Sequence, residues 1–203
     1  MTTLTRRGLL AMAPAAFAQP RPEPLFNGKN LDGWYRAAFG IWRIENGELT
    51  GTSDHTLPGP GYLMTQRAFR DFDLRLEFWI SRGGNSGVYI REPHRAWGSK
   101  GDLRPAHGKS RGYEIQIDYN DRKNLTGSVY DLKQSDRVLG GEERWNRYRI
   151  VCRAKRVEIW VNGEQANAFD GIESAEGAIG FQIHGQQPHD HTVKFRNIEI
   201  ITL

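Results

Sequence analysis

The sequence has 203 residues, of which 38% are hydrophobic and 26% are charged, with 23 glycines and a single cysteine. This composition excludes a collagen, a coiled coil, a disulfide-stapled miniprotein and a long disordered tail, and the length fits a single domain. The 28 lysines and arginines against 24 aspartates and glutamates give a net charge of +4 at pH 7, which raises the question of an acidic partner.

The first 18 residues have the order of an export signal. The pair Arg6 and Arg7 precedes a short apolar stretch, and a run of small residues ends at Ala18. This order is typical of a twin-arginine signal, and the apolar part is shorter than the roughly 20 residues of a membrane-spanning helix. We expect residues 1–18 to be this signal and residues 19–203 to be one domain, periplasmic or secreted, with no membrane span. Removing the arginine pair lowers the net charge from +4 to +2, which argues against a nucleic-acid partner.

Cys152 has no partner within the chain for a disulfide bond. It alternates in phase with Tyr148 and Ile150, so we expect it to be a small buried core residue rather than a nucleophile.

Alternation of apolar and polar residues recurs along the chain, whereas no window of helical length keeps the apolar spacing of an amphipathic helix. We therefore expect an all-β fold, a two-sheet antiparallel sandwich of jelly-roll type. Asn46-Gly47 and Asn162-Gly163 are predicted hairpin turns. The clearest predicted strands cover residues 71–80, 87–91, 112–119, 126–131, 147–153, 156–162, 178–184 and 193–201.

The phase of the alternation also predicts which side chains share a face, because residues two apart on a strand point the same way. The rows that face away from the core contain hydrogen-bonding groups and no lysine, which favours a sugar-binding surface if the strands are neighbours. The alternative is a wet sheet surface whose polar residues pair across strands. The predicted outward rows include Glu77, Tyr89, Arg91, Glu114, Gln116, Asp118, Gln182 and His184.

Several segments together resemble one family in order along residues 25–203. The most specific are LFNGKNLDGW at 25–34, NSGVYIR at 85–91 and FRNIEI at 195–200. They resemble the 3-keto-disaccharide hydrolase family, also described as 3-keto-glucoside 1,2-lyase/3-keto-2-hydroxy-glucal hydratase domains, which implies a concanavalin A-like jelly roll. The sequence departs from the family pattern at Arg144, where an acidic residue is usual, and in a histidine-rich loop at 188–191.

The resemblance implies cleavage of glycosides already oxidised to a ketone at carbon 3. The ketone acidifies the hydrogen on carbon 2, so a base can start an elimination that expels the glycosidic oxygen, and water then adds. The expected catalytic residues are His184, Glu114, Asp118 and, near the oxyanion, Arg91. The expected substrate-binding residues are Asn85, Tyr89, Gln116, Gln182, Glu77 and Trp97.

Three alternatives stay open. Glu114, Asp118 and His184 together would suit Mg, Mn, Ca or Zn, although no local motif requires a metal. A two-carboxylate glycosidase mechanism competes with elimination. A non-catalytic carbohydrate-binding module competes with both, because this fold also serves lectins.

The expected partner is a small oligosaccharide or glycoside, and the sequence sets neither its aglycone nor the oligomeric state. Residues 92–111 have little strand pattern and are predicted to form a substrate-covering loop that contains Trp97.

Overall fold

The computed structural model describes residues 21–53, 56, 58–93, 112–185 and 189–203. The predicted signal at 1–18, Trp97 and most of the predicted covering loop lie outside these residues. Within the described ranges all the named elements are β-strands, as the alternation predicts. This part of the chain contains no helix long and apolar enough to cross a membrane.

The larger sheet has eight strands, in the order β11-β10-β9-β6-β13-β4-β3, with β1 paired to β13. In that order the strands are Glu164–Asp170, Arg156–Val161, Asn146–Arg153, Phe72–Ile80, His191–Thr202, Glu48–Ser53 and Ile41–Glu45, and β1 is Glu23–Pro24.

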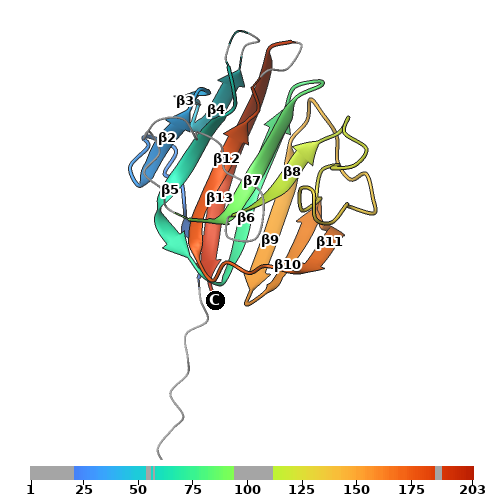
Figure 1. Ribbon diagram of the computed structural model, residues 1–203. Coiled ribbons are helices and arrows are strands. Elements are labelled where there is room, and N and C mark those ends of the chain that lie inside the picture. The colour runs from blue at the N-terminus through green and yellow to red at the C-terminus, as the bar shows by residue number, and fades with distance from the viewer. Residues whose placement is uncertain (1–20, 54–55, 57, 94–111, 186–188) are drawn as a thin grey trace, which may run out of the picture.

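The smaller sheet has five strands in the order β2-β5-β12-β7-β8, and Figure 1 shows it in front of the larger sheet. In that order the strands are Trp34–Ala38, Gly61–Phe69, Gly177–Ile183, Asn85–Glu92 and Tyr113–Asp118. Neighbouring strands are antiparallel in both sheets, so the predicted two-sheet antiparallel sandwich is confirmed.

One hydrophobic core lies between the sheets. The rings of Phe181 on β12 and Phe195 on β13 stack with centroids 4.2 Å apart, and Trp34 on β2 stacks on Phe181 at 5.4 Å. Cys152 is fully buried in this core, and burial raises the pKa of its thiol to about 11. The core role predicted for Cys152 is confirmed.

Both predicted hairpin turns are present. Asn46 and Gly47 have φ angles of 53° and 80°, and Asn162 and Gly163 have φ angles of 54° and 89°, as a two-residue turn with two left-handed positions requires.

The strand predicted at residues 126–131 is wrong. This segment forms turns, with isolated bridges from Val129 to Ile115 and to Lys133. Gly127 and Asp131 have φ angles of 94° and 56°, and left-handed residues at both places interrupt an extended chain.

Candidate functional site

Three neighbouring strands of the smaller sheet, β12, β7 and β8, carry the polar rows predicted from the sequence. The pairing aligns Gln182 with Gly87 and Gln116 across these strands. Two residues along the strands, Tyr89 pairs with Glu114. The condition that the rows belong to neighbouring strands is therefore met.

Glu114 lies at the centre of a buried hydrogen-bond network. Its side chain is 4% exposed, and its Oε2 accepts a hydrogen bond from the hydroxyl of Tyr89 at 2.8 Å. The same hydroxyl accepts one from Nε2 of Gln182 at 3.2 Å. With its nitrogen turned toward Glu114, the amide of Gln116 donates to Oε1 of Glu114 at 3.3 Å and to the carbonyl of Ser86 at 3.1 Å. These polar residues are buried, unlike those of a wet sheet surface.

Burial raises the pKa of Glu114 to about 8. The hydrogen bond from Tyr89 opposes this shift and the charge of Asp131 adds to it, and no cation is among the groups that shift the pKa. A carboxyl group in such surroundings keeps its proton at neutral pH, because an unpaired buried charge is costly. Glu114 is thus a proton donor at pH 7.

Tyr62 on β5 extends the network and was not among the residues predicted from the sequence. Its ring meets that of Tyr89 edge to face, with centroids 5.5 Å apart, and its hydroxyl hydrogen-bonds to Gln182 and Tyr89. Burial is the main cause that raises the pKa of Tyr62 far above its ordinary value, and the negative charge of Glu114 adds to this shift. Both tyrosines therefore stay protonated. The signal was present in residues 61–69, where Tyr62 alternates with Met64, but this segment was not recognised as a strand.

Gly87 makes room for the carboxyl group of Glu114. A Cβ atom added at Gly87 would lie 2.3 Å from Oε1 and 2.7 Å from Cγ of Glu114. Such contacts are closer than atoms tolerate, so the Glu114 side chain rests over the backbone of β7 only because residue 87 has no side chain.

The other end of the polar rows contains His184 and Asp118. The backbone amide of His184 donates to the carbonyl of Asn85, and Asn85 pairs with Asp118. Oδ1 of Asp118 accepts hydrogen bonds from the amides of Asn120 and Asp121 at 2.6 and 3.1 Å, while burial raises the pKa of this carboxyl group.

His184 is a candidate base at neutral pH. Burial lowers its pKa, although the carbonyl of Gly185 and the charge of Asp118 oppose the shift. Nδ1 of His184 lies 2.5 Å from the Gly185 carbonyl oxygen, which can only accept a hydrogen bond. The neutral ring thus carries its proton on Nδ1, and Nε2 is the nitrogen that accepts a proton.

The predicted metal ligands do not form one cluster. Glu114 and Asp118 are four residues apart on β8, which separates their backbones by about 13 Å at the usual rise per residue. Among the described residues, no three His, Cys, Asp or Glu side chains form a group that could hold a metal ion. The structure thus does not assemble Glu114, Asp118 and His184 into the predicted ligand set.

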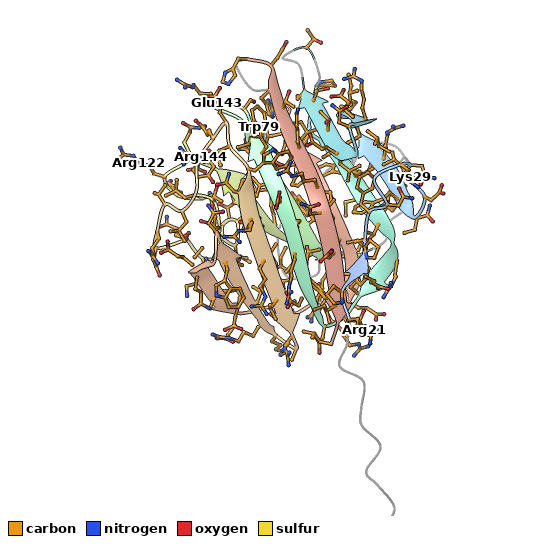
Figure 2. All side chains as sticks on the ribbon, turned by 180° about the vertical axis from the view of Figure 1, so that it is seen from behind. Arg21, Lys29, Trp79, Arg122, Glu143 and Arg144 are labelled. Atoms are coloured by element: carbon orange, nitrogen blue, oxygen red, sulfur yellow. The ribbon has the colours of Figure 1, made fainter. Side chains whose placement is uncertain are left out.

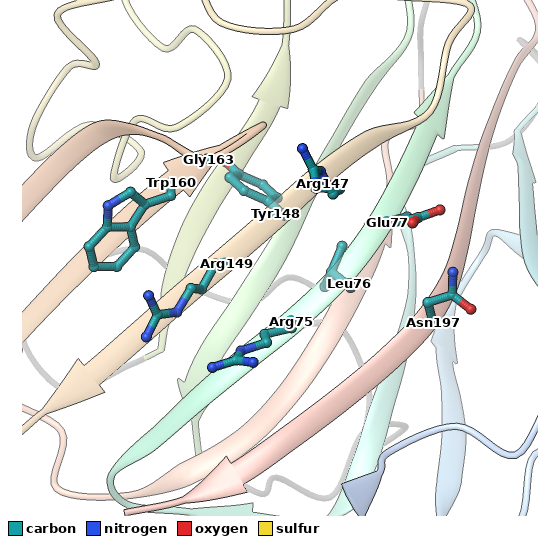
Figure 3. A pocket seen from close by; sticks show the side chains of 9 residues that line it. All are labelled: Arg75, Leu76, Glu77, Arg147, Tyr148, Arg149, Trp160, Gly163 and Asn197. Atoms are coloured by element: carbon teal, nitrogen blue, oxygen red, sulfur yellow. The ribbon is translucent and has the colours of Figure 1, made fainter. Parts of the chain in front are cut away.

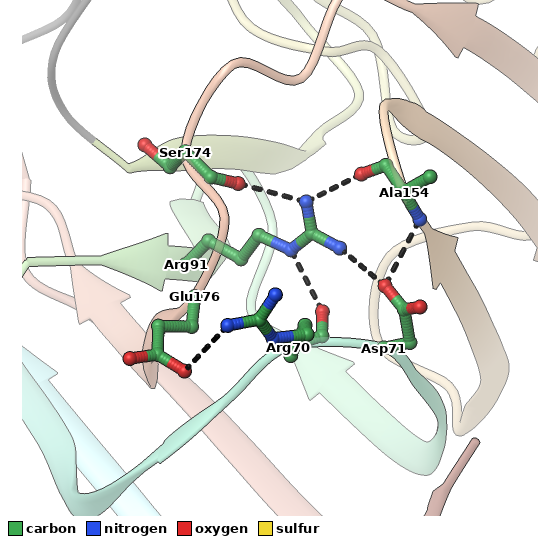
Figure 4. Close-up of polar contacts among 6 residues, drawn as sticks. All are labelled: Arg70, Asp71, Arg91, Ala154, Ser174 and Glu176. Carbon is green, nitrogen blue, oxygen red and sulfur yellow. Dashed lines mark hydrogen bonds and ion pairs between the residues drawn. The ribbon is translucent and has the colours of Figure 1, made fainter.

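Arg91 does not point to the polar rows, contrary to the prediction. Its side chain is 1% exposed and donates to the backbone carbonyls of Arg70, Ala154 and Ser174 and to Oδ1 of Asp71 (Figure 4). These contacts join the β5–β6 turn, the β9–β10 turn and the segment before β12. Arg91 therefore fastens three turns and is not placed to stabilise an oxyanion.

A β-bulge explains this difference. Arg91 has a φ angle of 50°, and the register between β7 and β12 shifts where Gly180 pairs with Tyr89 but Ala178 pairs with Glu92. The extra residue on β7 reverses the alternation beyond it. Glu92 thus takes the outward position, and its charge contributes to the raised pKa of Tyr89.

Glu77 also lies away from the polar rows. It belongs to β6 in the larger sheet and pairs with Arg196 on β13 at 2.7 Å. Alternation correctly placed it on an outward face, but that face belongs to the other sheet. The structure therefore brings together Glu114, Gln116, Tyr89 and Gln182, places His184, Asn85 and Asp118 at the adjoining end, and separates Glu77 and Arg91 from them.

Comparison with known proteins agrees with this architecture. A crystal structure described as a glycosyl hydrolase from Parabacteroides distasonis superimposes with a TM-score of 0.68 at 21% identity, over 90% of this chain and 94% of that one. A Bacillus subtilis protein with a galectin-like fold superimposes with a TM-score of 0.58 at 13% identity, over 90% of this chain and 94% of that one. At these identities the likeness shows the fold alone, and the predicted jelly roll is confirmed.

Two sequence comparisons go further. A 3-keto-disaccharide hydrolase from Bacteroides thetaiotaomicron is 25% identical over 88% of this chain and 77% of its own length. The model of the 3-keto-alpha-glucoside-1,2-lyase-like domain matches residues 21–201, nearly all of the domain that carries the polar rows. The chain belongs to the 3-keto-alpha-glucoside-1,2-lyase-like domain family, as the sequence motifs predict.

Proposed function

We propose that this protein cleaves glycosides that carry a ketone at carbon 3 of the sugar, by elimination followed by hydration. The observation that carries the proposal is a protonated, buried Glu114 and a neutral His184 on opposite sides of the Gln182–Gly87–Gln116 row. An acid and a base that flank one row are the two groups that an elimination needs. The family description and the name of the Bacteroides relative support the keto sugar as substrate.

In the proposed first step, Nε2 of His184 removes the proton from carbon 2. Glu114, about 13 Å farther along the strands, supplies through intervening water the proton that the glycosidic oxygen takes up. The bond from carbon 1 to that oxygen breaks, a double bond forms between carbons 1 and 2, and the alcohol leaves. Water then adds its oxygen to carbon 1 and a proton to carbon 2. The net change is hydrolysis, so no oxidant or reductant is consumed.

The remaining groups of the network have roles in this scheme. The ketone oxygen gains negative charge in the first step, and the protonated hydroxyl of Tyr62 is a donor in the network that could stabilise it, since the hydroxyl of Tyr89 already donates to Glu114. The side chains of Gln116 and Gln182 would orient sugar hydroxyls. The charge of Asp118 favours the imidazolium of His184 as it forms.

The test uses the full chain, a 3-keto-disaccharide and the same disaccharide without the ketone, in deuterated water. We expect release of keto sugar with deuterium on carbon 2 from the first substrate only. The variants His184→Gln and Glu114→Gln should each slow release by about 100-fold or more. Release without deuterium would contradict elimination, and saturable binding without release would show a carbohydrate-binding module instead.

The same assay is repeated with a chelator and with added Mg, Mn, Ca or Zn, which tests whether the reaction requires a metal.

The export signal at residues 1–18 remains a separate proposal. Replacing Arg6 and Arg7 by lysine keeps the charge, and we expect it to leave the full-length precursor in the cytoplasm of the expressing bacterium.

A further inference from the structure

A groove lies on the outer face of the larger sheet, on the side of the sandwich opposite to Glu114. Figure 2 shows this sheet facing the viewer, and Figure 3 shows the groove of about 380 Å³ on it. Its size is within the usual range for ligand sites. The side chains that matter for its chemistry are Arg75, Glu77, Arg147, Arg149 and Trp160.

One row across the groove places two arginines opposite each other. Trp160 on β10 pairs with Arg149 on β9, which pairs with Arg75 on β6. Like charges directly opposite on neighbouring strands repel, so such a row needs a counter-charge. One is present in Asp73, which is 4% exposed.

Asp73 binds both arginines, and Glu199, which pairs with Arg75 from β13, is a second carboxylate in the row. Asp73 accepts hydrogen bonds from Arg75 at 3.3 and 2.8 Å and from Arg149 at 3.0 and 2.9 Å. Burial alone would raise the pKa of Asp73, but the two guanidinium groups hold it below its ordinary value, so it stays ionised. These bonds use Nε and Nη2 of each arginine. They fix the orientation of each guanidinium group, and Nη1 of neither arginine binds Asp73.

The next row adds an uncompensated charge. Arg147 on β9 is exposed and pairs across the sheet with Glu77, but the carboxylate of Glu77 binds Arg196 at 2.7 Å. Among the described residues, no carboxylate forms an ion pair with the side chain of Arg147. The groove therefore presents one free guanidinium group next to two that are held in position.

Trp160 supplies an apolar surface beside these charges. Its indole is partly exposed, and the guanidinium carbon of Arg149 lies 5.0 Å from the ring centroid. A guanidinium group matches a carboxylate through two parallel hydrogen bonds, and an indole packs against the apolar face of a sugar ring.

We propose that this groove binds an oligosaccharide that contains uronic acids, with the sugar carboxylate on Arg147 and the neighbouring Nη1 atoms, and a ring on Trp160. Asp73 and Glu199 offset the charge of Arg75 and Arg149, which suits a single carboxylate better than a phosphate backbone that requires several free cations.

The test measures binding of a short oligogalacturonate and of a neutral oligosaccharide of equal length to the full chain by calorimetry. We expect only the acidic sugar to bind. Arg147→Gln and Trp160→Ala should each weaken it at least tenfold, whereas Glu114→Gln should leave it unchanged. The matched control is Arg153→Gln, an equal charge change on an exposed residue of β9 outside the groove, which should change the affinity less than twofold.

Three results would overturn the proposal. If oligogalacturonate does not bind to the protein, the groove is not a uronate-binding site. An equal loss in Arg147→Gln and Arg153→Gln would show unspecific charge attraction. Arg147→Gln is a fair probe because, in the part of the chain that the structure describes, the Arg147 side chain forms no ion pair. Equal or tighter binding of a single-stranded oligonucleotide of the same charge would identify a phosphate site rather than a uronate site.

Discussion

The hydroxyl of Tyr89 donates a hydrogen bond to the carboxyl group of Glu114 across two neighbouring strands, at 2.8 Å and with both side chains almost fully buried. Burial keeps the proton on Glu114, and the tyrosine limits how far its pKa rises. The contact between Tyr89 and Glu114 therefore leaves Glu114 able to donate a proton at neutral pH.

Glu114→Gln is expected to reduce kcat by about 100-fold or more, because a carboxamide cannot supply the proton to the leaving oxygen. In the unmodified protein the rate should fall as the pH rises through about 8, where Glu114 loses its proton. Steady-state kinetics from pH 5 to 10 measure both. Glu173→Gln changes an exposed carboxylate and serves as control. A full rate above pH 9 would contradict Glu114 as the acid.

Glu114 should also make the protein less stable as the pH rises. Its pKa is about 8 when folded and near 4.5 when unfolded, so between these values the unfolded chain releases a proton that the folded chain keeps. The free energy of unfolding then falls by about 1.4 kcal/mol per pH unit from this group.

The buried histidines raise the free energy of unfolding as the pH increases, but they do so mainly below about pH 7. The pKa of His191 is about 4 when folded against 6.5 unfolded, so its contribution rises with pH up to about 6.5. Urea unfolding of both the unmodified protein and Glu114→Gln at pH 7.0, 7.5 and 8.0 isolates Glu114 by difference, because the histidine contribution is common to both, and the fall should disappear in Glu114→Gln. An equal slope in both proteins would mean that the Glu114 carboxyl is ionised in the fold.

Tyr89→Phe should move the alkaline limit of activity to higher pH. The hydrogen bond from Tyr89 lowers the pKa of Glu114, so its removal raises that pKa further. The rate at pH 7 should fall because the network loses an oriented donor. The pH profile of kcat tests the shift, and a limit that moves to lower pH would contradict the assigned contact.

Gly87→Ala is expected to displace the Glu114 side chain and abolish most activity, because the added Cβ would lie 2.3 Å from Oε1. Overpacking of this kind costs about 1 to 3 kcal/mol of stability. Gly141→Ala is the control, since its Cβ would meet only the flexible side chain of Arg144 at 3.3 Å. Activity and urea unfolding of both variants provide the comparison, and an active Gly87→Ala protein would show that Glu114 can move freely.

Arg91→Gln should unfold more easily without a chemical defect. It leaves the three carbonyl groups and Asp71 without their buried cation, which costs about 3 to 5 kcal/mol. The kcat of the folded fraction at low temperature should stay within twofold of the unmodified value. A large loss of kcat at unchanged stability would restore the oxyanion role that the sequence predicted.

Much of the site followed from alternation within single strands. Glu114, Gln116 and Asp118 share a face because successive side chains of a strand point in opposite directions, and this rule needs no knowledge of the rest of the chain. Tyr89 and Gln182 were placed outward by the same rule. Residues 61–69 were not recognised as a strand, so Tyr62 was not predicted.

Other features depended on contacts between residues far apart in sequence. The strands β12 and β7 are neighbours in the sheet although they are far apart in the sequence. Gln182 contacts Tyr89 because of this pairing. The membership of Glu77 in the opposite sheet is a fact of the same kind. Arg91 has a left-handed backbone conformation at the bulge. Its own side chain therefore points toward the turns, and the side chain of Glu92 lies on the outward face.

The sequence by itself therefore determined the all-β class, the two hairpin turns, the family and the polar face of β8, because these depend on local periodicity and on short motifs. The tertiary structure decided which strands adjoin, where the bulge lies and how deeply Glu114 is buried. Ionisation depends on that burial and on neighbours from other strands, so only the folded chain decides that this carboxyl group keeps its proton.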